Sequence, residues 1–285
     1  PVRLRKTDID YINKYWGACE DKSAPTLEKI HNKYYLRFSF TETVTLSDTP
    51  IAEQIICAVD LGINTDAVCS IMKADGTILA RKFIDFASDK DRMIHAMNRT
   101  RRKQSKYGPK SARGLWAYVK RLNEDRAKKI SAAIVEFASQ HSVDTIVMEH
   151  LDFKGCKKRG SKAQRLSMWN HGIIREKVEQ KAHLLGIRIA TICAWKTSAL
   201  AFDGSGSVTR DDNNHALAKF TTGKQYNCDL SASYNIGARY FIRELLKSLP
   251  ATEESRVKAK VPDVGRRTSC TLSTLRMLVK ELSAA

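Results

Sequence analysis

Two apolar runs in this chain each end in a carboxylate, and this pattern restricts the fold more than any other feature of the sequence. Residues 55–59 read Ile-Ile-Cys-Ala-Val and are followed by Asp60, while residues 145–148 read Thr-Ile-Val-Met and are followed by Glu149. Short apolar runs rich in β-branched residues are typical of strands buried on both faces. We therefore expect two central strands of a sheet, each with an acid at its carboxyl end.

The segments around these runs predict the order β-β-β-α-β-α-β-α. Residues 67–72 and 77–84 read as two more strands, and Asp75-Gly76 between them is a strong hairpin signal. Next come a long polar, helix-like tract over 90–141, the second acid-ending strand, a helix over 169–185, a strand over 187–195 and a last helix over 231–247. Strands that alternate with helices need a covered, largely parallel half-sheet. The expected fold class is α/β, a ribonuclease-H-like mixed sheet flanked by helices.

A third acid, Asp229, stands just before the last helix. In a ribonuclease-H-like sheet these three places lie together at one edge, so we expect Asp60, Glu149 and Asp229 to form one site. Carboxylates at the ends of apolar strands are costly to leave unpaired, and Mg²⁺ prefers oxygen ligands. Two divalent ions roughly 3.5–4 Å apart could then hydrolyse a phosphodiester bond. Taken singly, each acid could also be an ordinary strand end, and Asp229 a helix cap.

The charge balance indicates a polyanionic partner. The chain has 49 Lys and Arg against 31 Asp and Glu, a formal net charge of +18. Such an excess suits nucleic acid, because each cation near a phosphate releases condensed counterions. A membrane is the less favoured partner, since no apolar run reaches the roughly 20 residues that span a bilayer. Seven cysteines without a CxxC pair, and no signal peptide, predict a cytoplasmic location.

Three segments carry a more specific resemblance. AVDLGINTDAVCSI, TIVMEHLDF and YNCDLSASYNIGARYF contain the three acids and resemble, in order, the three RuvC motifs of the transposon-encoded TnpB proteins and the related type V CRISPR effectors. The resemblance covers about residues 51–249. It implies a prokaryotic RNA-guided DNA endonuclease of the RuvC type, with a guide RNA and a target DNA as partners. It also implies two Mg²⁺ ions, replaceable by Mn²⁺, at Asp60, Glu149 and Asp229.

The resemblance also suggests how the chain is divided. Residues 1–50 are expected to be part of a small N-terminal β-domain, a remnant of the guide-binding β-barrel, because residues 33–40 alternate between apolar and polar. Residues 51–250 are expected to form the RuvC domain, with inserted basic helices over about 90–141, and residues 251–285 a basic tail that ends in a short amphipathic helix. The helical segment that family members insert in the barrel is not recognisable, so a second protein chain could supply it.

One stretch departs from the family. TnpB-like proteins carry a zinc ribbon of two CxxC pairs between the second and third motifs, whereas residues 196–228 here retain only Cys228 and His215. Zinc needs about four ligands. We therefore expect no structural zinc, and a loop that is either degenerate or held in another way.

Several cations and one aromatic residue are candidates for contact with nucleic acid. The family places heteroduplex-contacting helices where the basic cluster over 99–106 lies, although such a run is also typical of a solvated face. A second basic cluster after Glu149 reads as a mobile lid or a disordered loop. Trp169 could stack on an unpaired base or pack inside the protein, and Arg239 could contact phosphate or form a surface ion pair. The candidates are Arg99, Arg101, Arg102, Lys103, Lys106, Lys154, Lys157, Lys158, Arg159, Trp169 and Arg239.

Other functions stay open at this point. A nuclease-dead RNA-guided DNA-binding repressor of the same ancestry would suit the missing zinc ligands and the short N-terminal part, but the three intact acids argue against it. An unguided RuvC-like resolvase would not need the extra basic helical tract. A transposase that joins DNA ends would need similar acids.

Overall fold

The computed structural model describes residues 3–19, 21–30, 32–39, 41–151, 168–211, 214, 216–266 and 268–284. The chain divides into two compact units, Pro1–Thr45 and Leu46–Ala285. The first unit contains helix α1 (Lys6–Ile12), a π-helical turn (Asn13–Gly17) and an antiparallel hairpin of β1 (Thr26–Ile30) and β2 (Lys33–Arg37). Within the described residues of this unit, β2 covers the first part of the strand that the sequence predicts over residues 33–40.

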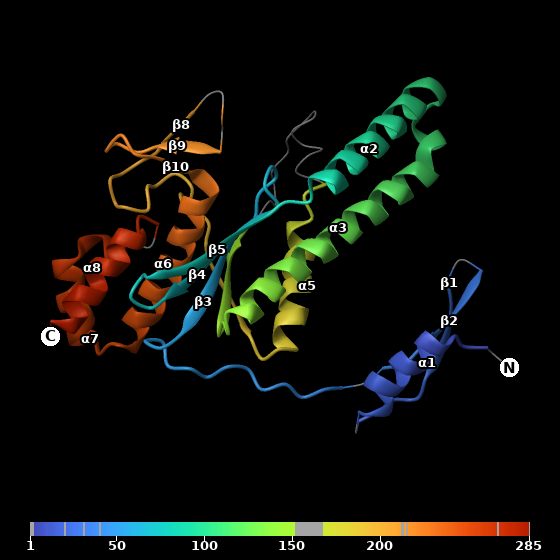
Figure 1. Ribbon diagram of the computed structural model, residues 1–285, viewed down its shortest axis with the longest axis horizontal. Helices are drawn as coiled ribbons and strands as arrows, with labels where there is room; N and C mark the ends of the chain where they lie inside the picture. The colour runs from blue at the N-terminus through green and yellow to red at the C-terminus, as the bar shows by residue number, and fades with distance from the viewer. Residues whose placement is uncertain are drawn as a thin grey trace. The chain divides into compact units, whose positions relative to one another are not determined.

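The second unit is built on a five-stranded mixed sheet with the order β5-β4-β3-β6-β7 (Figure 1). β3, β4 and β5 form an antiparallel meander, whereas β3, β6 and β7 run parallel. β3, the first strand of this sheet, therefore lies at its centre, next to β6, the second strand that ends in an acid. This is the arrangement that the ribonuclease-H-like fold requires. The predicted fold class is confirmed. The strands are β3 (Ile55–Asp60), β4 (Ala67–Lys73), β5 (Ile78–Ile84), β6 (Thr145–His150) and β7 (Arg188–Cys193).

The central strand β3 separates two apolar cores. Ile56 and Ala58 belong to one core and Cys57 and Val59 to the other, and all four are fully buried. This division follows from the period-two alternation of side chains along a strand. It explains why the run reads as continuously apolar, since both faces of β3 are covered.

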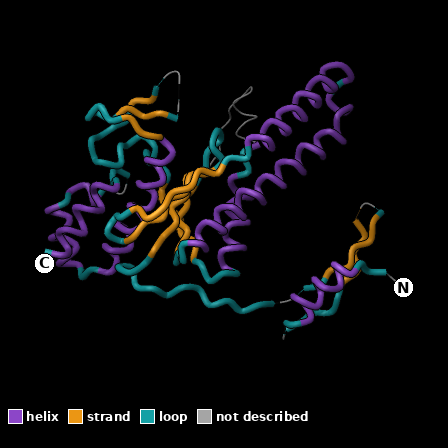
Figure 2. Tube along the Cα trace, viewed as in Figure 1, coloured by secondary structure: helices purple, strands orange, loops and turns teal. Residues whose placement is uncertain are grey.

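Helices cover both faces of the sheet (Figure 2). Helix α6 (Cys228–Ser248) packs on β3 and β4 from one side, while α3 (Arg113–Gln140) and α5 (His171–His183) cover the other. Gly237 permits the close approach of α6, because a Cβ there would lie 2.9 Å from Met72 Cε and 3.2 Å from Ala58 Cβ. A larger residue at this position would push the helix, and Asp229 at its start, away from the sheet.

The polar tract predicted over 90–141 forms a helical hairpin. Helix α2 (Ala87–Tyr107) ends at Gly108, whose φ of 84° suits glycine, and a 3-10 turn (Pro109–Ala112) leads into α3. A small apolar cluster of Met93, Ala96, Met97 and Val119 joins the two helices. The other side of α2 is polar and exposed, so the hairpin offers a charged helix face to solvent.

The stretch between the second and third motifs has a structure that the sequence does not predict. Three short strands, β8 (Thr209–Arg210), β9 (Leu217–Lys219) and β10 (Gln225–Asn227), form a sheet of order β10-β9-β8. Its described residues are held by an apolar cluster of Ala201, Ala218, Phe220 and Cys228. Apolar packing therefore holds the described residues of this stretch in place.

The residues predicted as a basic tail pack on the sheet domain. Helices α7 (Ala251–Lys260) and α8 (Leu272–Ser283) follow α6, and Leu272, Leu275 and Leu278 are fully buried in the same core as α6. These residues therefore form part of the layer that holds α6 in place. Among the described residues, no helix combines the length and the apolar character needed to cross a membrane.

Candidate active site

The fold brings Asp60 and Glu149 together on neighbouring parallel strands. Val59 pairs with Met148 across β3 and β6, and each acid is the next residue on its strand. By alternation Asp60 lies on the same face as Ala58, and Glu149 on the same face as Val147, and both of those residues face α6. The two carboxylates therefore share one edge and one face of the sheet.

The third acid comes from the helix that covers this face. Asp229 is the second residue of α6, which packs on β3, and its charge acts on Asp60 at the end of that strand. It does not cap the helix, because the side chain of Asn227 accepts a hydrogen bond of 2.9 Å from the Leu230 N–H and is the N-cap. Asp229 is thereby left to face the other two acids.

Glu149 and Asp229 both act electrostatically on Asp60. Burial raises the pKa of Asp60 well above its usual range, and the negative charges of Glu149 and Asp229 raise it further. Burial also raises the pKa of Glu149, against the opposing effects of a hydrogen bond from Thr197 and the charge of Arg239. The pKa of Asp229 is raised by burial and opposed by the charge of Arg210. The edge thus concentrates acidic groups whose charge the described residues only partly balance.

The donor set suits a hard divalent cation. All three groups are carboxylates, and oxygen ligands are what Mg²⁺ prefers. In the described part of the chain, no group of three or more His, Cys, Asp or Glu side chains is arranged so that it could hold a metal ion by itself. Mg²⁺ does not need one, because it keeps several waters and is usually held by one or two carboxylates together with substrate phosphates. The chemistry of the three carboxylates therefore suits a hard divalent cation bound together with substrate phosphates.

Glu149 is held in place by a short chain of buried polar contacts. The hydroxyl of Thr197 donates a hydrogen bond to Glu149 Oε1, and Thr197 is only 3% exposed. Asn235 on α6 in turn donates to the Thr197 and Leu200 carbonyls over 3.0 and 2.9 Å, and its own carbonyl accepts from the Leu272 N–H over 3.3 Å. Sequence analysis missed Thr197, because a lone threonine in a loop carries no recognisable signal.

An arginine from the small three-stranded sheet lies near the acids. Arg210 on β8 lowers the pKa of Asp60 and of Asp229 through its positive charge. It is exposed, and its guanidinium donates a 3.1 Å hydrogen bond to the Ser198 hydroxyl. The sequence did not single out this residue either, since it stands in a stretch without helical or strand periodicity.

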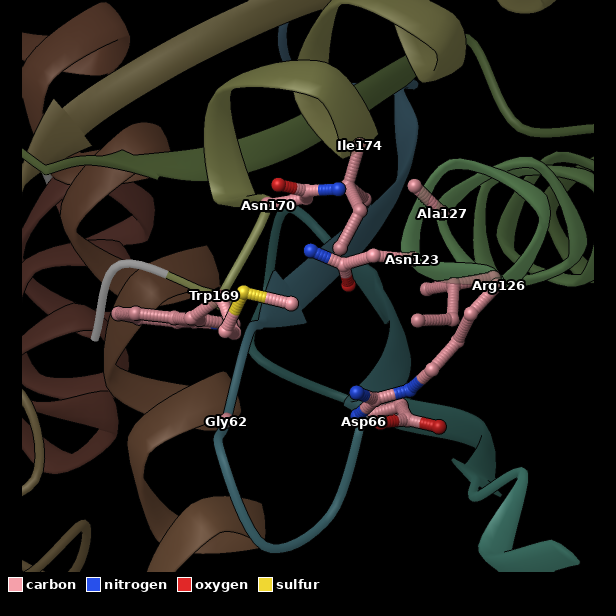
Figure 3. Close-up of a pocket in the computed structure, with 10 residues that line it drawn as sticks. Gly62, Asp66, Asn123, Arg126, Ala127, Trp169, Asn170 and Ile174 are labelled. Carbon is pink, nitrogen blue, oxygen red and sulfur yellow. Dashed lines mark hydrogen bonds and ion pairs between the residues drawn. The ribbon is translucent and has the colours of Figure 1, made fainter. Parts of the chain in front are cut away.

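The loop after Asp60 is fixed to both helices of the hairpin by Asp66. This aspartate is 1% exposed, and its carboxylate accepts from the Phe86 N–H over 2.8 Å and pairs with Arg126 and Lys90. Figure 3 shows the guanidinium of Arg126 lying against Asp66, beside the turn that contains Gly62. A Cβ on Gly62 would collide with the Thr65 carbonyl oxygen, so the turn needs glycine. The contacts hold the chain rigidly just beyond the first acid.

The predicted nucleic-acid contacts fall into separate groups. The five cations of the 99–106 cluster are exposed on α2, and Trp169 is half-buried just before α5. The cluster after Glu149 (Lys154, Lys157, Lys158 and Arg159) and His215 lie outside the described residues.

Arg239 requires a correction, because it is neither a phosphate contact nor part of a surface ion pair. The residue is 5% exposed, and its guanidinium donates to four backbone carbonyls at distances of 2.7 to 3.1 Å. The sequence alone could not show that the protein's own backbone surrounds this guanidinium. The acceptors are the carbonyls of Cys193, Trp195, Thr268 and Cys270.

Comparison with known proteins gives likenesses to solved structures alone. No protein-family model and no curated protein matches the chain. A Cas12f1–sgRNA–target DNA complex is 18% identical over 74% of this chain and 54% of that one, with a TM-score of 0.49. The AacC2c1–sgRNA complex is 10% identical over 66% and 39%, with a TM-score of 0.49. RuvC of T. thermophilus bound to a Holliday junction is 10% identical over 68% and 96%, with a TM-score of 0.37.

This chain spans about half the length of the Cas12f chains that it matches, 54% and 49%. Identities and scores this low leave the assignment of a function to the chemistry of the site itself.

Proposed function

We propose that this chain is a Mg²⁺-dependent endonuclease of the RuvC type that cuts DNA under the guidance of an RNA. The observation that carries the proposal is the convergence of Asp60, Glu149 and Asp229 on one edge of the sheet, with pKa values raised by burial. Perturbed carboxylates that gather from separate elements are typical of functional sites. The family proposed is that of TnpB and the type V effectors, because the three motifs arrive in its order.

In the proposed reaction, Asp60, Glu149 and Asp229 would hold two Mg²⁺ ions, for which Mn²⁺ would substitute. Such ions would supply Lewis-acid activation of a water and charge stabilisation at the phosphate. Thr197 keeps the Glu149 carboxylate in one orientation through its hydroxyl. Arg210 is placed to bind a phosphate oxygen of the strand, because it is exposed and its charge already acts on two of the acids.

The partners proposed are a guide RNA and a target DNA, with a second protein chain as a possible source of further N-terminal parts. The net charge of +18 suits both nucleic acids. The exposed cations of α2 are the proposed backbone contacts, with Trp169 as a stacking residue. The cations after Glu149 (Lys154, Lys157, Lys158 and Arg159) stay proposed contacts as well.

The direct test is cleavage of end-labelled DNA by the full chain with the RNA that it carries. We expect cleavage in Mg²⁺ or Mn²⁺, none in EDTA, and a loss of at least about 10³-fold with Glu149→Gln, which keeps the shape of the side chain and removes its charge. If the parent binds DNA without cutting it in any metal, a DNA-binding repressor replaces the nuclease. Cleavage that needs no RNA and prefers a four-way junction would indicate a resolvase.

Thr197→Val tests how Glu149 is positioned. The valine keeps the shape of the threonine but removes the hydroxyl that bonds Glu149 Oε1. Loss of such a supporting hydrogen bond costs about 10–100-fold in metal affinity or activity. We expect the Mg²⁺ concentration for half-maximal cleavage to rise by that factor, while Thr197→Ser stays close to the parent. A variant that unfolds more easily but keeps the parental Mg²⁺ dependence would reduce Thr197 to a structural residue.

Removing charge from α2 tests the proposed backbone contacts. Arg102 and Lys103 are exposed on this helix. Replacing both with Gln should lower the slope of log affinity against log salt by about 1.4 for single-stranded DNA, since each phosphate contact contributes about 0.7. The matched control replaces Lys258 and Lys280, two exposed lysines of the C-terminal helices. If both double variants change the slope equally, α2 has no special role.

A further inference from the structure

A cavity of about 400 Å³ opens between the loop that follows Asp60, helix α2 and the residues that precede α5. Cavities of roughly 300–1,000 Å³ are the size that small ring systems occupy in proteins. It shares Arg126, Met168 and Trp169 with the smaller cavity of Figure 3, where Arg126 comes from α3 and Trp169 from the segment before α5. None of the three acids lines it.

The walls of the cavity are apolar and soft. Met93 and Met97 on α2 are each 8% exposed, and Trp169, which precedes α5, also lines the cavity. Ile94, also on α2, lines the cavity as well and is 51% exposed. Thioethers and an indole pack well against flat aromatic faces.

The polar groups of the cavity suit a ring that carries nitrogen and oxygen atoms. Asn64 and Asn98 supply amides, and Lys90, Arg101 and Arg126 supply cations. Lys90 and Arg126 also pair with Asp66, so their charge is partly balanced. Arg126 is 9% exposed, yet its Nε–H has no hydrogen-bond partner in the described part of the chain. A buried donor of this kind calls for an acceptor that the described residues do not supply.

The position of the cavity relates it to the carboxylate site. Ile63 and Asn64, which line it, follow Asp60 within four residues, so about 14 Å is the longest possible separation along the chain. The pairing of Asp66 with Arg126 and Lys90 fixes this loop against α2 and α3. A group held in the cavity would therefore be held at a set distance from the acids.

We propose that this cavity receives one unstacked base of the substrate strand, close to the phosphate that is cut. The proposal rests on the proposed nuclease function and adds a subsite to it. The base stacks between Trp169 and the methionines of α2, and the amides and Arg126 bond its edge. Stacking of this kind tolerates every base, because each has a flat aromatic face. The subsite fixes the register of the strand without reading its sequence.

The test is a scan with a single abasic site moved along a single-stranded DNA, with binding measured to the full-length Asp60→Asn variant so that the strand stays intact. We expect one position at which loss of the base weakens binding about 5- to 150-fold, the range for one base–aromatic stack. Adding Trp169→Ala should remove the dependence on that position, as coupling in a double-mutant cycle requires. Trp195→Ala, which removes an exposed tryptophan outside the cavity, should leave it unchanged.

A second variant keeps the test decisive if Trp169→Ala fails to fold. Ile94→Glu changes an exposed side chain that lines the cavity and should also abolish the position dependence, whereas Leu185→Glu, at an exposed leucine beyond α5, should not. A flat scan, or a position dependence that both cavity variants retain, overturns the subsite. If the position dependence appears with an RNA strand and not with DNA, the base that enters the cavity does not belong to the DNA substrate. Failure of the nuclease itself is distinguishable, because the parent would then not cut DNA in Mg²⁺.

Discussion

Asp60→Asn is expected to abolish cleavage and, at the same time, to stabilise the metal-free protein. The rate should fall by about 10³-fold or more, because a metal ligand contributes several kcal/mol to the transition state. Stability should change in the opposite direction, because burial and the charges of Glu149 and Asp229 disfavour the ionised form of Asp60 in the folded protein. Cleavage assays and urea unfolding in EDTA measure the two effects.

The gain in stability should depend on pH in a defined direction. A carboxyl group whose pKa is raised by folding binds its proton more tightly in the folded protein than in the unfolded chain. Its contribution to stability is therefore fully present below the unfolded pKa of about 3.9 and is lost as the pH rises through the folded value. We expect the free energy of unfolding of the metal-free parent to fall over this window, and that of Asp60→Asn to fall less. Equal slopes would contradict a disfavoured charge at this position.

Asp66 provides the matched control, since it is an acid of the same loop with the opposite surroundings. Its carboxylate pairs with Arg126 and Lys90 and accepts a hydrogen bond from the Phe86 N–H. Asp66→Asn should destabilise the protein, because it leaves the buried guanidinium of Arg126 without its anion, whereas Lys90 keeps its ion pair with Asp85. The same substitution would thus have opposite effects at two positions of one loop. That contrast separates an acid retained for binding a cation from an acid that holds the structure together.

The sequence predicted the sheet and its acids because local patterns encode them. The apolar runs of β3 and β6 directly indicate strands that are buried on both faces. Once the fold class is known, the acids at the ends of these two strands are expected to lie close together. The alternation that separates Ile56 and Ala58 from Cys57 and Val59 is likewise a local property. Conventional strand and helix signals therefore sufficed for the sheet and its main helices.

The residues that support the acids could not be predicted in this way. Thr197 contacts Glu149 across 48 positions of the chain, and Arg126 contacts Asp66 across 60. Such contacts depend on tertiary packing and leave no periodicity in either segment. The strands β8 to β10 have only two or three residues each, too few for alternation to register, and they bring Arg210 to the acids. Because the resemblance implies a zinc ribbon at this place, the sequence analysis of this stretch concerns its missing cysteines and does not consider Arg210.

Arg239 shows how helical spacing can mislead about role. Spacing after Asp229 indicates that the side chain faces inward, and a cation near catalytic acids suggests a phosphate contact. The structure instead surrounds the guanidinium with backbone carbonyls from the end of β7 and from the segment before α8. Burial lowers the pKa of Arg239, which reflects the cost of placing this charge away from water. Its hydrogen bonds offset that cost and tie together three separate parts of the domain.

Arg239→Met should therefore destabilise the domain by about 3–5 kcal/mol in urea unfolding, because buried carbonyls that lose a charged donor are left without a partner. Arg256→Met, on the surface of α7, removes the same charge where it forms only an exposed pair of 3.5 Å with Glu253, and should change stability by less than about 0.5 kcal/mol. If Arg239 bound phosphate instead, its variant would unfold like the parent and lose affinity for DNA. The positive charge of Arg239 also lowers the pKa of Glu149. In Arg239→Met this pKa should therefore rise, so that the variant molecules that remain folded should reach a given Mg²⁺-dependent rate only at a higher pH than the parent.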